Sequence, residues 1–151
     1  MASFSAEVHE AEKLHVEAQQ LFAQQQYGLA AARWKAGLSA ATKIPDVETR
    51  RRVQATLVGS FACAVDLSGD PQGSITWHEK AFNLHGRFGD FEAQGSCMCN
   101  CGNSYMNAGN LEKAFECFSL AKEIATTEGI KGLFKQVRLP LLACTVSNSG
   151  A

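Results

Sequence analysis

Cysteine is the residue type in this sequence with the clearest capacity for chemistry, because its thiol can bind a metal ion or change its redox state. Cys97, Cys99 and Cys101 alternate with other residues in the stretch C-M-C-N-C. A structural zinc site needs four converging ligands, typically in paired C-x-x-C spacing, and this stretch contains no such pair. On a helix Cys97 and Cys101 share a face, whereas Cys99 does not. We expect these cysteines to be small packing residues, with no metal site and no cofactor.

Histidines and the common enzyme motifs add no catalytic signal. His78 and His85 are seven positions apart and would share a helix face, but no acidic pair with metal spacing and no H-E-x-x-H accompanies them. The sequence also lacks G-x-S-x-G, a Walker loop and G-x-G-x-x-G. We expect no catalytic residue and no enzymatic activity.

Charge and hydropathy argue against nucleic acid and membrane partners. The formal net charge of the 151 residues is -1, so no overall field attracts an acidic polymer or lipid surface. The basic run that ends in Arg50, Arg51 and Arg52 is interpreted as a solvated helix face. No stretch approaches the roughly 20 apolar residues that span a bilayer. The N-terminal segment resembles neither a signal nor a transit peptide, so we expect a cytoplasmic protein with reduced cysteines.

A repeat supplies the elements that would position any site. When the chain is shifted against itself by about 40 positions, Gly69 falls on Gly109 and Asp70 on Asn110. A shift of about 44 positions brings the N-terminal part onto the middle part. Periods of this size are typical of stacked helical pairs.

Each repeating unit has a physical logic. Its first helix carries an apolar stripe with a small residue in the middle, which is Ala18, Ala62 or Gly102. A small side chain there lets a neighbouring helix approach closely. In two units a turn follows with glycine, which adopts the left-handed conformation readily, and then Asp or Asn, which caps the next helix. These turns are expected at Gly69 and Gly109, and a third at Gln25–Gln26.

The third unit, N-C-G-N-S-Y-M-N-A-G-N-L-E-K-A-F-E-C-F-S-L-A, closely resembles a tetratricopeptide repeat (TPR). The positions that carry the resemblance are Gly102, Tyr105, Gly109, Asn110, Ala114, Phe118 and Ala121. The second unit departs from the pattern, since Ser74 stands where the third unit has an alanine and His78 replaces the bulky aromatic residue. The resemblance covers about residues 11–127, and its long period is similar to that of Pins/LGN-type adaptors.

The resemblance implies an all-α fold, a right-handed superhelix of antiparallel helix pairs with about three repeats and a C-terminal helix. We expect one domain over 1–151, with repeats at about 11–44, 47–87 and 90–127 and a terminal helix at about 130–145. The terminal helix would turn Leu133, Phe134, Val137 and Leu141 toward the third unit. Pro140 would kink or end it.

The asparagines are the strongest binding signal. Asn100, Asn103 and Asn107 form one polar stripe opposite the apolar stripe of the same helix. In a superhelix of such units the first helices line the concave groove, and amides can both donate to and accept from a peptide backbone. We therefore expect an adaptor or scaffold that binds a peptide or helix of a protein partner. The expected groove residues are His15, Gln19, Phe22, Ser60, Cys63, Asp66, Cys99, Asn100, Asn103 and Asn107.

Chaperone binding is not expected. TPR proteins that hold the C-terminal carboxylate of Hsp70 or Hsp90 use Lys, Asn and Arg side chains as a clamp. The matching positions here carry His15, Gln19, Ser60, Ser96 and Asn100, with no lysine or arginine among them. A desolvated carboxylate needs charge-assisted donors.

Two alternatives stay open. The chain could be a structural subunit of a larger assembly that makes contact through its convex face or its apolar C-terminal end, including self-association through that end. Less favoured is a redox- or metal-responsive module that uses Cys63, Cys97 and Cys99, in which Cys63 and Cys99 are the pair to examine for oxidation.

Overall fold

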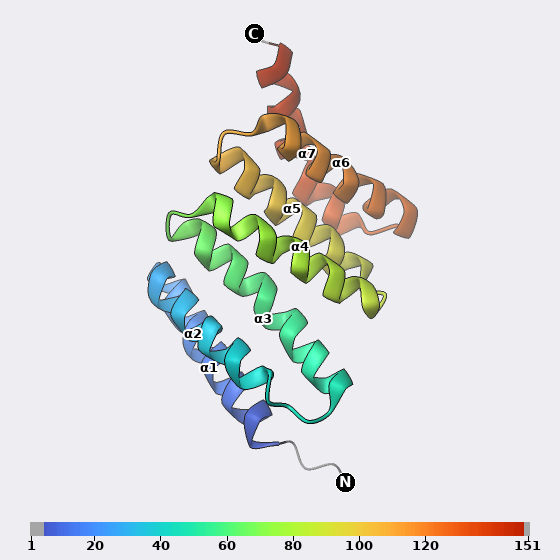
Figure 1. Cartoon of the computed structure of the whole chain (residues 1–151). Helices are drawn as coiled ribbons and strands as arrows, with labels where there is room; N and C mark the ends of the chain where they lie inside the picture. The colour runs from blue at the N-terminus through green and yellow to red at the C-terminus, as the bar shows by residue number, and fades with distance from the viewer. Residues whose placement is uncertain (1–4, 150–151) are drawn as a thin grey trace. The chain divides into compact units, whose positions relative to one another are not determined.

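The computed structural model describes residues 5–149, with side chains as far as Cys144. Over these residues the chain forms seven α-helices joined by short turns, with no β-strand (Figure 1). The helices are α1 (Ala6–Ala23), α2 (Tyr27–Ala41), α3 (Val47–Leu67), α4 (Pro71–Arg87), α5 (Phe91–Asn107), α6 (Leu111–Glu128) and α7 (Lys131–Ser149). The prediction of an all-α fold is confirmed.

The chain divides into two compact units. Met1–Asp70 contains α1 to α3, and Pro71–Ala151 contains α4 to α7. The division falls between the two helices of the predicted repeat 47–87. A single domain of three repeats and a terminal helix therefore stays a prediction.

In the first unit α2 packs against both α1 and α3. Trp34 is buried, and its indole Nε1 donates a hydrogen bond to His15 Nδ1 at 2.8 Å. The ring of Phe22 meets the rings of Tyr27 and Trp34 edge-on, at centroid distances of 5.0 and 5.8 Å. The small residue predicted in the stripe of α1, Ala18, is completely buried, which allows this close approach of α2.

The predicted turns lie where the helices end. Gln25, Gly69 and Gly109 have φ values of 61°, 110° and 83°, in the left-handed region that ends a helix. After the last of these, Asn110 Oδ1 accepts a hydrogen bond from the backbone N–H of Lys113 at 3.1 Å and caps α6. The left-handed Gly109 and the Asn110 cap thus determine where α5 ends and α6 begins. These two helices carry most of the residues of the sites described below.

The second unit has one apolar core. Its members come from α4, α5, α6 and α7, and Phe118 at its centre is completely buried. The two departures of α4 from the repeat pattern are also accommodated here. Ser74 is fully buried with its Oγ 2.9 Å from Ser104 Oγ, and His78 is only 1% exposed. The polar residue at position 74 is therefore matched by a hydroxyl on the neighbouring helix.

The terminal helix differs from expectation in two respects. Leu133 and Val137 are buried as predicted and Leu141 is partly buried, but Phe134 remains 37% exposed. The helix also runs through Pro140 to Ser149, beyond the expected end at about 145, so of the two expected effects of Pro140, a kink or an end, it does not end the helix. A proline in a helix interior costs about 3 kcal/mol. Burial of Val137 before it and of Cys144 after it stabilises both halves of α7.

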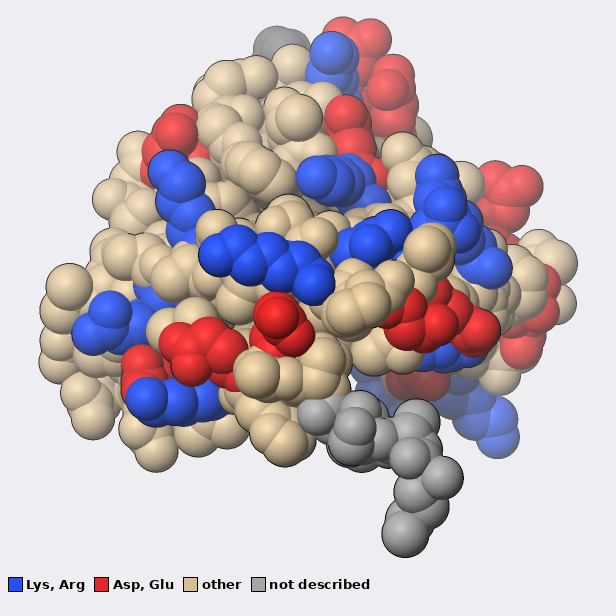
Figure 2. All heavy atoms as spheres, turned by 60° about the horizontal axis from the view of Figure 1, so that its bottom comes forward, with Lys and Arg blue, Asp and Glu red and all other residues tan. Residues whose placement is uncertain are grey.

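The face drawn in Figure 2 carries charges of both signs. Figure 2 shows lysine and arginine side chains interspersed with aspartate and glutamate, as the net charge of -1 suggests. In the described part of the chain, no helix combines the length and the apolar character needed to cross a membrane.

Candidate functional site

The predicted amide stripe lies on the accessible side of α5. Asn103 and Asn107 are exposed and Asn100 is half-buried. On the opposite side of the helix, Met98 and Cys101 belong to the core of the second unit. Because α5 has 3.6 residues per turn, packing one stripe against α4 and α6 turns the amides away from these helices. The exposed amide surface on this side can offer donors and acceptors to another molecule.

Cys99 does not belong to an accessible surface, contrary to expectation. It is 5% exposed and part of the same core as Leu133 and Val137 of α7. The cause is the close approach of α7 to α5 at Gly95, where an added methyl group would collide with the side chain of Leu133. Ser96, one residue further along α5, contacts Gln136 of α7 at 3.4 Å.

The predicted residues of α1 have mixed surroundings. Gln19 is exposed, whereas His15 and Phe22 are half-buried and contact Trp34. Burial lowers the pKa of His15, and its Nδ1 is already engaged as the acceptor of the indole N–H. These two side chains thus stabilise the α1–α2 pair, and each keeps part of its surface open to solvent.

The predicted residues of α3 are all half-buried. Ser60 Oγ lies 3.5 Å from the carbonyl oxygen of Thr56 in its own helix. Burial, with a smaller contribution from the Asp66 carboxylate, raises the pKa of the Cys63 thiol to about 11. Cys63 is therefore protonated at neutral pH and a poor nucleophile. The residues of α1 and α3 belong to the first compact unit, and Cys99 and the three asparagines to the second.

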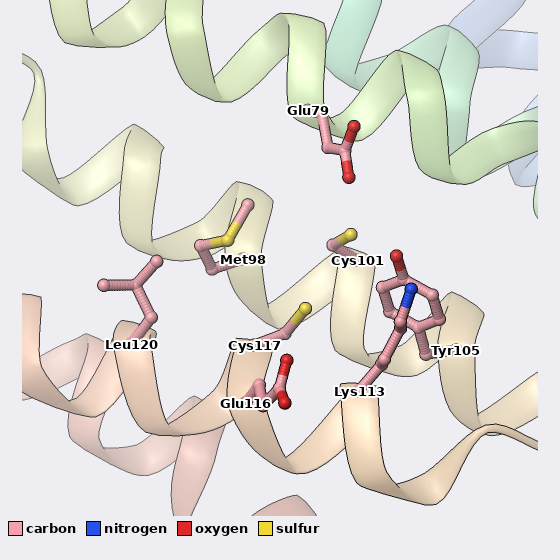
Figure 3. Close-up of a pocket in the computed structure, with 8 residues that line it drawn as sticks. All are labelled: Glu79, Met98, Cys101, Tyr105, Lys113, Glu116, Cys117 and Leu120. Atoms are coloured by element: carbon pink, nitrogen blue, oxygen red, sulfur yellow. The ribbon is translucent and has the colours of Figure 1, made fainter.

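A pocket of about 290 Å³ opens on the other side of α5 from the amide stripe, between α4, α5 and α6 (Figure 3). Its lining residues are Glu79, Met98, Cys101, Tyr105, Lys113, Glu116, Cys117 and Leu120. The floor is the apolar stripe of α5, and charged side chains of α4 and α6 stand around it. Sequence reasoning identified the stripe but not the pocket.

Two thiols meet in this pocket. Cys101 is 1% exposed and Cys117 is half-buried, and their side chains share a hydrogen bond. That bond is the main cause of a lowered pKa at Cys117, to which the Lys113 ammonium also contributes. The same bond, together with burial, raises the pKa of Cys101.

Sequence analysis gave Cys117 no role. The repeat pattern assigns a function in packing to the neighbouring Phe118 and none to position 117. The available signal was its place on the α6 face that meets the apolar stripe of α5. Across the described residues, no group of three or more His, Cys, Asp and Glu side chains is placed to hold a metal ion.

A second hollow, of about 480 Å³, lies over α6 and α7. It is lined by Phe115, Ser119, Lys122, Glu123, Thr126, Thr127 and Leu141. Large apolar side chains of these two helices are also exposed, among them Leu139 at 71% and Leu142 at 59%. We call the exposed residues Leu139 and Leu142 of α7 the C-terminal apolar face.

Comparisons with known proteins support the helical-repeat architecture. No family model matches the sequence, and the search of curated proteins finds no match. Among solved structures, the chain is similar to the crystal structure of a TPR-like protein from Chlorobium tepidum, with a TM-score of 0.74 and 17% sequence identity. The match covers 96% of this chain and 97% of that chain. The fold is therefore TPR-like.

Proposed function

We propose that this chain is an adaptor that binds a peptide or helix of another protein along the amide stripe of α5. The observation that carries the proposal is the position of Asn100, Asn103 and Asn107 on one accessible side of a helix whose other side is packed into the core. The TPR-like fold supports an interaction module in general, and the long repeat period, similar to that of Pins/LGN-type adaptors, supports the adaptor role.

The chemistry of the stripe favours an extended peptide or the polar side of a helix. Each asparagine amide offers two donor hydrogens and a carbonyl acceptor, so a row of them can satisfy the backbone N–H and C=O groups of a bound segment. One such hydrogen bond contributes about 0.5–1.5 kcal/mol. Loss of two or three bonds would therefore weaken binding by roughly ten-fold or more, since 1.4 kcal/mol is a factor of ten.

Affinity purification from cell extract tests the proposal. Wild type would be compared with the triple variant Asn100→Ala, Asn103→Ala, Asn107→Ala. The matched control is Asn83→Ala, which removes an exposed amide from α4 instead. We expect a partner that is retained by wild type and the control but lost from the triple variant, with unchanged circular dichroism. Equal recovery on all three proteins would exclude the stripe, and equal loss of fold and binding would argue for a structural role.

A second candidate is assembly through the C-terminal apolar face. It is favoured by the exposure of Leu139 and Leu142, because soluble monomers rarely leave large apolar patches uncovered. Sedimentation over a range of concentrations distinguishes the candidates. Self-association predicts a mass that rises above 16.3 kDa with concentration and returns to it in Leu139→Gln/Leu142→Gln. A mass that stays at the monomer value at all concentrations would exclude self-association through this face.

A further inference from the structure

The pocket between α4, α5 and α6 joins two features that the proposed function does not use. One is a space large enough for part of a small molecule, about 290 Å³, and the other is a pair of thiols in hydrogen-bond contact. The thiols come from different helices, Cys101 from α5 and Cys117 from α6 (Figure 3). The pair is distinct from the amide stripe, which occupies the opposite side of α5.

The charges around Cys117 come from two of the three helices that line the pocket, α4 and α6. Lys113 of the same helix favours its thiolate, whereas Glu116 and, from α4, Glu79 oppose it. The hydrogen bond with the Cys101 thiol of α5 is the largest cause of the lowered pKa of Cys117, and partial burial opposes it. Lys113 Nζ also lies 5.7 Å from the centre of the Tyr105 ring, which places its charge at the pocket.

The other cysteines described lack this combination. Burial holds the pKa of Cys63 and Cys99 at about 11, so both are protonated at neutral pH. Cys97 and Cys144 are 6% and 0% exposed. Thiolate character and access together determine which thiol reacts. Cys117 is the cysteine that has both, and it has a second thiol beside it.

We propose that this pocket is a thiol–disulfide exchange site, in which Cys117 attacks a small disulfide and Cys101 completes the exchange. The substrate class is a low-molecular-weight disulfide that carries carboxylate and ammonium groups. Lys113 would pair with a carboxylate of the substrate, and Glu79 or Glu116 with an ammonium. A pocket of this volume is at the small end of ligand sites, which fits one half of such a molecule.

The exchange proceeds in two balanced steps. The Cys117 thiolate attacks one sulfur of the substrate R–S–S–R, forms a mixed disulfide Cys117–S–S–R and releases one R–S⁻. Cys101 then transfers its proton to the released R–S⁻ and attacks the Cys117 sulfur, which releases the second R–S⁻. Two protein thiols are oxidised to one disulfide between α5 and α6, and one substrate disulfide is reduced to two thiols.

Mass spectrometry of the full chain after incubation with oxidised glutathione tests the proposal. For wild type we expect a peptide cross-link between Cys101 and Cys117. In Cys101→Ser, which keeps a donor beside Cys117 but cannot form the disulfide, the mixed disulfide with glutathione should accumulate on Cys117. In Cys117→Ser neither product should form at this pocket. Cys63→Ser is the matched control, and it should behave as wild type.

The rate of alkylation gives a readout that is independent of the cross-link. Iodoacetamide at neutral pH should label Cys117 faster than Cys63 and Cys99, and the pH at which its rate is half-maximal should lie below that of these two thiols. Preferential labelling or glutathionylation of any other cysteine would overturn the proposal. So would a Cys117 adduct that persists in wild type without transfer to Cys101. Neither result depends on whether the amide stripe binds a partner.

Discussion

The ring of Phe118 lies directly against the α carbon of Gly102. A methyl group added at Gly102 would lie 2.7 Å from both Cε1 and Cζ of that ring, closer than real carbon contacts allow. The sequence repeat predicted a small residue at this place in α5 and a bulky aromatic residue in α6, and the two sit against each other. The space left by the missing side chain of Gly102 is thus filled by the ring of Phe118.

Gly102→Leu should destabilise the second unit by about 1–3 kcal/mol, because overpacking forces Phe118 out of its place in the core. Gly132→Leu in α7 is the matched control, since no atom lies within 4 Å of the position that a side chain would first occupy there. Urea unfolding followed by circular dichroism would measure both. Equal midpoints for the two variants would show that the α5–α6 contact is looser than described.

The hydroxyl pair formed by Ser74 and Ser104 should behave as one unit. Either single change to alanine removes a buried hydrogen bond and should cost about 1 kcal/mol of the free energy of unfolding. The double variant should cost less than the sum, with a coupling of at least about 0.5 kcal/mol. A double-mutant cycle in urea would measure the coupling. Strict additivity would mean that the 2.9 Å contact contributes nothing.

Stability should depend on pH through His15. Burial lowers the pKa of His15 in the folded chain, so between that value and about 6.5 the unfolded chain binds more protons. The free energy of unfolding should therefore fall as the pH drops from about 6.5 towards the folded-state pKa, and this contribution should be fully present above that window. Protonation of Nδ1 would also remove the acceptor of the Trp34 indole N–H.

The measurement is the urea midpoint at about pH 7.5 and about pH 5.5, on either side of the usual histidine pKa. His15→Asn supplies an uncharged acceptor and should show a smaller drop than wild type. The other histidines are identical in the two proteins, so the difference between the two curves isolates His15. Identical drops would assign the pH dependence elsewhere.

A peptide ending in Glu-Glu-Val-Asp should not bind. The positions that would form a carboxylate clamp carry no lysine or arginine, and Ser96 among them already contacts Gln136 of α7. Isothermal titration should give a Kd weaker than about 1 mM, which corresponds to about -4.1 kcal/mol. Low-micromolar affinity would contradict the residue assignment at these positions.

The features predicted well were those encoded locally. The turn at Gly109, the cap at Asn110 and the small residue at Gly102 depend on conformations and sizes that a short window of sequence specifies. The all-α class followed from them. The repeat pattern also marked Ser74 as a departure, but only the structure identifies its matching hydroxyl on the next helix.

The features predicted poorly depend on contacts between distant segments. Cys99 is buried by α7, a helix outside the repeat pattern. Its burial could therefore not be predicted from the repeat itself. Pro140 suggested a kink or an end of the helix, and the helix does not end there because burial on both sides of the proline outweighs its local cost. The approach of Cys101 to Cys117 arises from the register between α5 and α6, which the spacing of the motif alone does not fix.

The division of the chain into two compact units has a spectroscopic consequence. Its two tryptophans are distributed one to each unit, Trp34 in the first and Trp77 in the second. Trp34 donates to an imidazole, whereas Trp77 has the Lys80 ammonium 5.4 Å from its ring centre, so their emission should respond to different events. Trp34→Phe and Trp77→Phe would turn intrinsic fluorescence into a separate reporter for each half. Superimposable melting curves from the two proteins would then reveal a single cooperative transition, and displaced curves a molecule that comes apart in stages.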